Sequence, residues 1–440
     1  MERIIWLAYN ILFAIGYFLI LPRFLLRMWR RGGYLSCFLQ RFGVYMEDIA
    51  RKLAARPGRI MVHAVSVGEI QVAFRFMAEL RARAPGTAFV LTTTTSTAHA
   101  LALKTMHTDD VLLYFPVDFP FIVRRVLRQI NPAGLVLVES EFWPNLTRQM
   151  AARGGKIMLL NGRVSDRSFR RYSKVRPLVR RVLGFFDLLC AQSEQDAQRL
   201  IALGADPSKV KATGSAKYDI AGGSCRPDGQ FSGRLAELGF GPPNRVIVGG
   251  STWPGEEAAL LDVFKRLSAG MPELRLALVP RHAERRKEVM EEIRRSGLAF
   301  NLWSKCRGEG TPLPGKANIL LVDTTGELKN FYALADAVFI GKSLASRGGQ
   351  NPIEAAVQAK PIVVGPHMEN FQAVMADFLA AGAIIQVKKR GELEREISRL
   401  LADKAKAEAM GARARAVVLE KAGAAAKSAD YFLGLSRPNG

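Results

Sequence analysis

Short apolar runs alternate with helical patterns along most of the chain. Each run is rich in Val, Ile and Leu and does not alternate with polar residues, which is typical of strands buried on both faces of a parallel sheet. The segments between the runs carry helical patterns, so helices should cover the sheet. A first series of strands is predicted at residues 60–65, 88–94, 111–115, 135–139, 156–161, 188–193 and 210–215.

This pattern stops near residues 216–244, where Gly and Pro are frequent, and we predict a linker there. A second series of apolar runs follows it. Two helical patterns, over about 391–402 and 404–433, end the chain, and no strand follows the last one. The second series of strands is predicted at residues 246–251, 274–280, 318–323, 337–343, 361–366 and 383–387.

The two series predict an α/β protein with two Rossmann-like domains, as in a GT-B glycosyltransferase. Ligands of such sheets bind at the carboxyl ends of the strands, so we expect a cleft where the two domains face each other. The fold alone does not fix a function. The expected parts are an anchor with a basic flank (1–31), a first domain (32–218), the linker (219–244), a second domain (245–403) and a C-terminal helix packing back on the first domain (404–440).

The N-terminal segment is predicted to attach the chain to a membrane. Residues 4–21 carry no charge, and about 20 apolar residues suffice to cross a bilayer as a helix. Nine basic and two acidic residues lie between positions 22 and 60, which by the positive-inside rule places the rest of the chain in the cytoplasm. The absence of a small-residue cleavage site disfavours a signal peptide. A buried first helix is the other alternative, and spanning and interfacial attachment are both compatible with this length.

The formal net charge of +23 predicts an anionic partner. Eight basic residues and one acid, Asp166, lie between Arg163 and Arg181. This run suits lipid headgroups or a phosphorylated lipid acceptor, although most charge runs are solvated helix faces. It lacks the interleaved aromatic residues of a single-strand binding platform, so nucleic acid is not an expected partner.

Several absences narrow the class. The four cysteines are far apart, which argues against a disulfide framework and for a reducing compartment. There is no GxxxxGK[ST] loop, so this is not a P-loop enzyme. There is also no D-x-D pair, no HExxH motif and no Cys/His cluster, so we expect neither a metal nor another cofactor.

Three glutamates follow predicted strands of the first domain. Glu69 opens a helix after a turn and is a candidate general base, with a simple macrodipole role as the alternative. Glu139 and Glu141 end a buried strand, where residues two apart share a face. Contact with substrate and an ion pair with a Lys or Arg are nearly equal expectations for these two.

Four turns of the second domain carry signs of phosphate binding. They contain Ser251-Thr252, Arg281-His282, Thr325-Gly326-Glu327 and residues 348–352. In the last turn, Asn351 suits an N-cap and Pro352 the first helical position. The glycines before them admit a ligand to the backbone, and helix N–H groups can bind phosphate. Each sign is weak alone, but four at strand ends of one domain predict a nucleotide site.

Read in order, these motifs resemble the 3-deoxy-D-manno-octulosonic acid (Kdo) transferases. The resemblance covers about residues 1–375 and includes HAVSVGEI, TTTTSTA, FPVDFP, ESEFWPNL, NGRVSDRS, TGSAKYD, GSTWPGEE, VPRHAER, DTTGELKNFYALAD and GGQNPIEA. It implies a GT-B fold and inverting transfer of Kdo from CMP-Kdo to the glucosamine 6-hydroxyl of a lipid A precursor, lipid IVA. It also implies work on the cytoplasmic face of a bacterial inner membrane.

The resemblance also implies roles for individual residues. Glu69 matches the proton acceptor, and Glu139 and Lys217 match groups that stabilise the transition state. The first domain would then meet the acceptor and the second would bind the donor, with no metal. The implied contacts to the CMP of the donor are Arg281, His282, Thr325, Gly326, Glu327, Asn351, Pro352, Ile353 and Glu354.

Three motifs depart from the family pattern. Gly341-Lys342-Ser343 stands where GGS is common, Gln350 where a His is frequent, and TGSAKYD where the family has a TGNLKFD-like motif. None removes a residue with an implied role. The alternatives are another GT-B enzyme that uses a UDP-sugar and a non-catalytic protein that binds lipid precursors.

Overall fold

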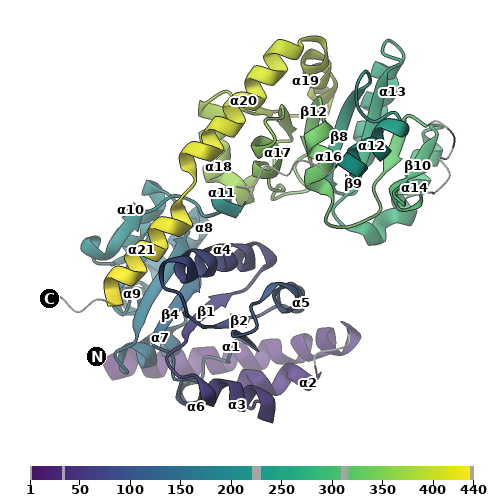
Figure 1. Cartoon of the computed structure of the whole chain (residues 1–440). Coiled ribbons are helices and arrows are strands. Elements are labelled where there is room, and N and C mark those ends of the chain that lie inside the picture. Colours follow the sequence, from purple (N-terminus) through teal and green to yellow (C-terminus); the bar gives the residue numbers. More distant parts are fainter. Residues whose placement is uncertain (1, 32–34, 221–228, 309–314, 316, 437–440) are drawn as a thin grey trace. The chain divides into compact units, whose positions relative to one another are not determined.

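The computed structural model describes residues 2–31, 35–220, 229–308, 315 and 317–436 (Figure 1). The chain divides into two compact units. The first comprises Met1–Ile220 and Gly423–Gly440, and the second comprises Ala221–Ala422. Each unit contains one seven-stranded parallel sheet, which confirms the predicted α/β class.

The first sheet has the order β3-β2-β1-β4-β5-β6-β7. Its first strand therefore lies between β2 and β4, and the direction of winding changes between β1 and β4. All seven predicted strands are present: β1 Ile60–Ala64, β2 Phe89–Thr93, β3 Val111–Tyr114, β4 Gly134–Val138, β5 Lys156–Gly162, β6 Leu188–Ala191 and β7 Val210–Ala212.

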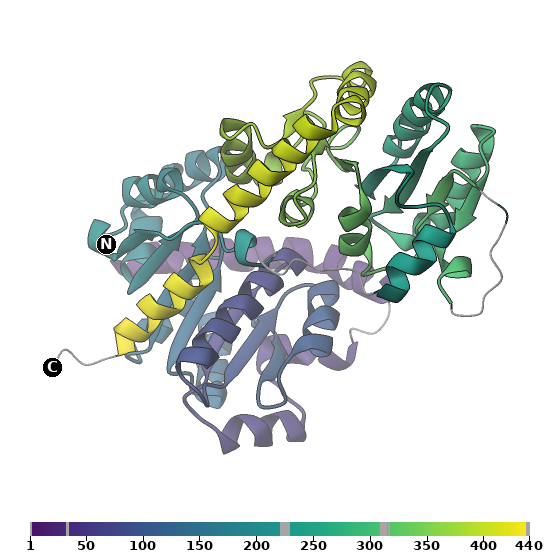
Figure 2. The ribbon, with the colours of Figure 1, turned by 45° about the horizontal axis from the view of Figure 1, so that its top comes forward.

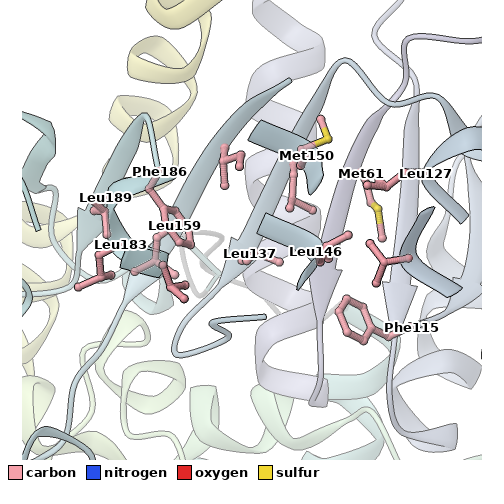
Figure 3. Packing of buried hydrophobic residues seen from close by; sticks show 14 of the residues in the cluster. Met61, Phe115, Leu127, Leu137, Leu146, Met150, Leu159, Leu183, Phe186 and Leu189 are labelled. Atoms are coloured by element: carbon pink, nitrogen blue, oxygen red, sulfur yellow. The ribbon is translucent and has the colours of Figure 1, made fainter. Parts of the chain in front are cut away.

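Helices cover both faces of the first sheet because successive strand side chains point to opposite sides. Met61 belongs to one core cluster and Val62 to the other. Figure 3 shows the first cluster, where Leu146 and Met150 pack over the sheet beside Leu137. That face carries α1 Glu2–Arg31, α3 Glu47–Ala55, α6 Pro120–Ile130, α7 Pro144–Ala151, α9 Arg176–Gly184 and α10 Glu194–Leu203, and the other carries α4 Val67–Arg83, α5 Ser96–Thr105 and α21 Ala424–Ser436.

The second sheet has the order β10-β11-β9-β8-β12-β13-β14. Its six predicted strands are present, and β10, a three-residue edge strand, was not predicted. The strands are β8 Arg245–Thr252, β9 Leu274–Pro280, β10 Phe300–Leu302, β11 Ile319–Leu321, β12 Ala337–Ile340, β13 Ile362–Val364 and β14 Ile385–Gln386. The helices used below are α13 Glu256–Ser268, α14 Arg286–Arg295, α16 Leu328–Leu334, α17 Ile353–Val357, α18 Gln372–Ala380, α19 Gly391–Ala402 and α20 Lys404–Lys421.

The predicted linker is only partly without structure. A helix, α12 (Gly229–Glu237), lies within it, so the linker prediction is wrong for these residues. The Phe231 ring packs against Trp303 and Phe331, with centroids 5.2 and 5.3 Å away, and Leu235 is fully buried. The flanking Gly and Pro residues hid this short apolar spacing. Residues 221–228 lie outside the described part.

Two helices, not one, form the C-terminal region. The first, α20, belongs to the second unit, where Ala407 and Met410 join the core. The chain enters the first unit at Gly423, and α21 packs there with the Phe432 ring against Phe76 of α4. Figures 1 and 2 both show α21 beside α4. The expectation of a helix packing back on the first domain therefore holds for α21 and is wrong for α20.

Asp219 caps the start of α21, and its loss should weaken the first unit. Its carboxylate accepts hydrogen bonds from the backbone N–H groups of Gly423 and Ala425. We expect Asp219→Ala to lower the free energy of unfolding by about 2 kcal/mol in urea titrations followed by circular dichroism. Asp430→Ala is the control, because its exposed pair with Arg83 should contribute at most about 1 kcal/mol. Equal effects would contradict the capping role.

Candidate active site

The three glutamates of the first unit lie where the winding of its sheet changes. Glu69 follows β1, and Glu139 and Glu141 follow β4, which is the strand beside β1. Open α/β sheets bind ligands at this kind of position, because the loops after the two strands diverge there. The sequence placed candidate functional carboxylates after both strands, and the pairing of β1 with β4 brings those strand ends together.

Glu69 is held by the start of α4. Ser66 is the N-cap residue, and its hydroxyl accepts the Glu69 N–H at 3.4 Å. The Glu69 carboxylate in turn accepts the Val65 N–H at 2.6 Å and the Ser66 hydroxyl at 3.0 Å. This reciprocal arrangement resembles a capping box. These hydrogen bonds tie Glu69 to the start of the helix and fix the position of its carboxylate.

The environment of Glu69 raises its pKa to about 7. Burial is the largest cause, because it disfavours the charged form. The negative charge of Glu139 adds to it, and the hydrogen bond from the Val65 N–H opposes it. A carboxylate that titrates near neutral pH suits a general base.

Glu139 forms an ion pair with Lys217, the first residue of α11 (Lys217–Ile220). The Lys217 Nζ lies 3.1 Å from the Glu139 Oε1, and both side chains are about one-fifth exposed. Glu139 has a φ of 62°, in the left-handed region that a glutamate rarely adopts. Backbone strain of this kind gathers at functional sites. The ion pair expected as one alternative is present, and it joins two of the three implied catalytic residues.

Glu141 is partly buried, with a side chain that is 23% exposed. Its carboxylate accepts the Trp143 Nε1–H at 2.8 Å, and burial raises the pKa of the carboxyl group. The His63 Nε2 lies 3.9 Å away. Burial lowers the pKa of His63 to about 3, so the ring is neutral at pH 7 and this contact is not an ion pair. His63 stacks on Phe115, with centroids 3.6 Å apart, and its ring is part of the packing under this edge of the sheet.

Asn161 positions the segment that carries Lys217, and sequence reasoning did not single it out. Its Oδ1 accepts the Ala216 N–H at 3.0 Å, and its φ of 56° is left-handed. This bond joins the NGRVSDRS and TGSAKYD motifs. An asparagine at a strand end was the available signal, because Asn tolerates the left-handed region better than most residues.

In the second unit, Glu256 organises the point where the winding changes between β8 and β12. Its carboxylate is fully buried and accepts four backbone N–H groups at 2.8–2.9 Å. One comes from Trp253, after β8, and the others come from the loop after β12. Those donors are Lys342, Ser343 and Leu344. Sequence reasoning did not single out Glu256.

Arg281 and His282 follow β9 and are exposed. The Arg281 N–H donates to the Thr252 carbonyl at 3.1 Å, and the His282 ring lies 5.7 Å from the Trp253 ring. Lys342 reaches the same indole, with its Nζ 4.5 Å from the ring centroid. His282 and Lys342 therefore lie beside one aromatic side chain, Trp253, and the Arg281 backbone is hydrogen-bonded to the residue before it.

The other predicted donor residues lie at the starts of α16 and α17. Asn351 Oδ1 accepts the Ile353 N–H at 3.1 Å, but the N-cap residue of α17 is Pro352, so the predicted placement of Asn351 at the N-cap and Pro352 at the first helical position is wrong by one residue. Burial raises the pKa of Glu354, and the positive charges of Lys329 and Arg281 oppose that rise.

Lys329 follows closely after the Thr325-Gly326-Glu327 turn, so three of the predicted motifs converge near Glu354. Gly326 has a φ of 92°, which favours glycine at this position. The Glu327 carboxylate accepts the Trp303 Nε1–H at 3.0 Å and lies near Arg307.

The basic run of the first unit lies on α8 (Asp166–Lys174) and α9. No residue of α8 is buried, and most of the cations are exposed. Within the part of the chain that the structure describes, no three His, Cys, Asp or Glu side chains gather in a way that could hold a metal ion.

Comparison with known proteins identifies the family. A family model described as 3-deoxy-D-manno-octulosonic-acid transferase (kdotransferase) matches residues 37–220. A 3-deoxy-D-manno-octulosonic acid transferase of Bordetella pertussis is 34% identical over 423 residues, covering 93% of this chain and 95% of that protein. One of Haemophilus influenzae is 28% identical, covering 90% and 94%.

Solved structures support the fold. The UDP-GlcNAc 2-epimerase of Neisseria meningitidis, solved with UDP-GlcNAc, matches 86% of this chain and all of its own with a TM-score of 0.57. Its 13% identity limits that likeness to the GT-B-like architecture. The relatives, with the site described above, show that the chain belongs to the 3-deoxy-D-manno-octulosonic acid transferase family and is a GT-B glycosyltransferase of lipopolysaccharide biosynthesis.

Proposed function

We propose that the enzyme transfers Kdo from CMP-Kdo to the glucosamine 6-hydroxyl of a lipid A precursor, lipid IVA, with inversion and without a metal. The observation that carries this proposal is the arrangement at β1 and β4. A carboxylate with a pKa near 7, Glu69, lies next to the Glu139–Lys217 ion pair in a first unit that belongs to this family.

Glu69 acts as the general base. The acceptor hydroxyl gives its proton to the Glu69 carboxylate as its oxygen attacks the anomeric carbon of Kdo. The bond from that carbon to the phosphate oxygen breaks, and CMP leaves with the bonding electron pair. A single displacement inverts the anomeric centre. The raised pKa leaves the carboxylate partly ionised near pH 7 and basic enough to accept the proton.

Glu139 and Lys217 stabilise the transition state. The sugar carbon gains oxocarbenium character as the donor bond breaks, as in glycosidase chemistry. The carboxylate of Glu139 offers negative charge to this centre, and Lys217 holds the carboxylate in place through their 3.1 Å contact. Because the contact is partly buried, its charges are less screened than those of a surface pair.

The second unit binds the nucleotide. His282 and Lys342 lie beside Trp253, and with Arg281, which follows β9, they supply positive charge and N–H donors to the departing phosphate. Residues 325–327 and 351–354 complete the contacts to CMP. Fixed positive groups of this kind can stabilise a leaving phosphate in place of a metal ion. The glycines after β12, Gly348 and Gly349, have positive φ, and a Cβ at these positions would collide with the Asn370 and Met368 side chains, so both positions require glycine for the shape of this loop.

The reaction takes place on the cytoplasmic face of the inner membrane, where the lipid acceptor lies. The basic residues that follow position 22 support the cytoplasmic side, because positively charged flanks of membrane segments stay in the cytoplasm. The exposed cations between Arg163 and Arg181 are suited to the phosphates of the acceptor or to neighbouring anionic lipids.

A donor and acceptor assay tests the proposal. The full-length enzyme is incubated with CMP-Kdo or with UDP-GlcNAc, each with and without lipid IVA, and the freed nucleotide and the lipid mass are measured. We expect CMP release and a lipid heavier by Kdo only when CMP-Kdo and lipid IVA are both present. Transfer from the UDP-sugar, or no transfer with retained lipid binding, would overturn the proposal in favour of one of the two alternatives. The lipid mass also gives the number of Kdo residues added.

A further inference from the structure

The N-terminal helix α1 has one face packed on the first unit and the opposite face open. Trp6 is only 3% exposed and belongs to the core cluster under the sheet. Phe13 and Tyr17 pack against the same cluster. Figures 1 and 2 show α1 lying along the first unit instead of projecting from it. The contacts run from Trp6 to Tyr17, about 16 Å of helix.

Polar contacts fix this docking in the middle of the apolar segment. The Tyr9 hydroxyl donates to the Asp118 Oδ2 at 2.8 Å, and the Asn145 Nδ2 donates to the Asn10 Oδ1 at 2.8 Å. Asp118 also accepts the Asn145 and Leu146 N–H groups, so it joins α1 to the start of α7. Asp118 and Asn145 are almost fully buried.

This docking is incompatible with α1 crossing the bilayer. The segment Arg3–Pro22 is long and apolar enough to span, by length and composition alone. In a spanning helix, however, residues 9 and 10 would lie near the centre of the hydrocarbon. Their partners Asp118 and Asn145 would have to lie there as well, together with the charged surface of α6 and α7. Charged side chains at that depth cost several kcal/mol each.

The open face of α1 carries large exposed apolar side chains from Ile4 to Ile20. It continues onto α6, because Phe18 and Phe121 both pack against the Phe119 ring and Phe121 is 70% exposed. Exposed apolar patches of this kind mark protein or membrane contacts. The exposed large side chains of α1 are Ile4, Leu7, Ile11, Leu12, Ile15, Phe18, Leu19 and Ile20.

A basic groove beside α1 indicates that a lipid surface covers the open face of this helix. The groove lies between α6 and α7, has a volume of about 430 Å³ and is lined by Arg124, Arg128, Arg148 and Arg153. Arg148 lies over the Trp6 ring, 4.7 Å from its centroid, so the groove begins at α1. No acidic side chain lines it. Apolar surface beside clustered cations matches the acyl and phosphate layers of an anionic lipid leaflet.

We propose that α1 is an in-plane membrane anchor, docked on the first unit by its Trp6–Tyr17 face, with its opposite face in the acyl boundary of one leaflet and the α6–α7 arginine groove on the lipid phosphates. The chain then enters the membrane from one side only, and both its N-terminus and its two units stay on that side. This inference concerns attachment and does not depend on the transfer chemistry.

Depth measurements along the open face test the proposal. Ile4→Cys, Ile11→Cys and Phe18→Cys are made singly in the full chain with Cys37→Ser and Cys225→Ser, leaving the buried Cys190 and Cys306. A fluorescent label at each position is quenched by lipids brominated at different acyl depths. The positions lie seven residues apart, about 10 Å along the axis. We expect three similar, shallow depths. A label at position 11 that lies about 10 Å deeper than the other two would show a spanning helix and overturn the proposal.

A sidedness experiment gives an independent answer. Glu2→Cys in the same background is treated with a membrane-impermeant maleimide in sealed inverted inner-membrane vesicles, with the exposed Glu284→Cys as the reference for the side of the catalytic units. We expect both to react before detergent is added. Protection of position 2 until lysis would overturn the proposal.

The arginine groove has its own test. Arg124→Gln combined with Arg128→Gln should weaken binding to phosphatidylglycerol vesicles roughly fivefold per charge, with little change on phosphatidylcholine vesicles. Arg294→Gln with Arg295→Gln removes the same charge from an exposed helix of the second unit and is the matched control. Equal losses of vesicle binding in the two double variants would show that binding depends only on the net charge of the protein. The groove would then have no part in the proposed attachment.

Discussion

Glu69→Gln is expected to lower kcat for Kdo transfer about 10²–10⁴-fold, the usual contribution of a general base. Glutamine has the same shape and keeps an oxygen that can accept the Val65 N–H, so the start of α4 should remain formed. It cannot accept the proton of the attacking hydroxyl. The measurement is the rate of CMP release with saturating CMP-Kdo and lipid acceptor, together with circular dichroism to show that the fold is intact.

The control for this variant is Glu47→Gln, which neutralises an exposed glutamate of α3 in the same unit. It should transfer Kdo at the parent rate. CMP should bind equally well to both variants, because the proposed nucleotide contacts belong to the second unit. If Glu69→Gln transferred Kdo as fast as the parent enzyme, another group would have to be the base.

The pH dependence of the parent enzyme should report the same carboxyl group. Its pKa is raised to about 7, so it is protonated and inactive below that pH and ionised above it. We therefore expect kcat/KM to rise with pH and to level off above about 7. In Glu139→Gln the neighbouring negative charge is absent, so the rise should shift to lower pH as the total rate falls.

The strands were predictable because their sequence pattern is strong and local. Runs such as 157–160 are continuously apolar, which is typical of strands buried on both faces. The missed strand β10 has three residues at a sheet edge and lacks that pattern. The helix α12 was missed because glycines around it outweighed the spacing of Phe231 and Leu235. The helix α20 was assigned to the wrong unit because the unit against which a helix packs depends on contacts between residues far apart in the chain, which a local sequence pattern does not give.

The location of Glu69 and Glu139 was predictable because each lies at the end of a strand with a clear sequence pattern. The contacts that hold these residues were not predictable. The bond from Ala216 to Asn161 joins positions far apart in the chain, and it depends on the pairing of strands. The docking of α1 was equally hidden, because an apolar segment of 18 residues has the same composition whether it spans a bilayer or lies on a domain.

Glu256→Ala should cause the largest loss of stability in the second unit. Its carboxylate is fully buried and is the acceptor for four backbone N–H groups. Hydrogen bonds to a charged group contribute about 1.5–3 kcal/mol each, and an unsatisfied buried donor adds its own cost. Because four such effects in one cluster are not additive, we expect a loss of about 4 kcal/mol or more, which is a large part of the stability of a typical domain.

The consequence for function follows from where those donors lie. Three belong to Lys342, Ser343 and Leu344, the loop after β12, and Lys342 reaches Trp253 beside His282. Without the carboxylate this loop loses its fixed position next to the proposed phosphate site. CMP affinity should therefore fall in Glu256→Ala even at temperatures where the second unit stays folded.

Hydrogen exchange separates this mechanism from general destabilisation. In Glu256→Ala the N–H groups of residues 342–344 should lose more protection from exchange than the N–H groups of β9 or β11. A urea titration of the same variant measures its loss of stability. In Glu256→Gln the side chain keeps its volume, but an NH₂ group replaces one carboxylate oxygen and cannot accept hydrogen bonds from the backbone N–H groups. The N–H groups of residues 342–344 should therefore lose protection in this variant as well. Glu284→Ala, an exposed change in the same unit, should behave as the parent. Retained protection at residues 342–344 in both Glu256 variants would mean that the carboxylate does not hold the loop. The loop would then be held by two backbone hydrogen bonds, from the Gly349 N–H to the Lys342 carbonyl and from the Gln350 N–H to the Gly341 carbonyl.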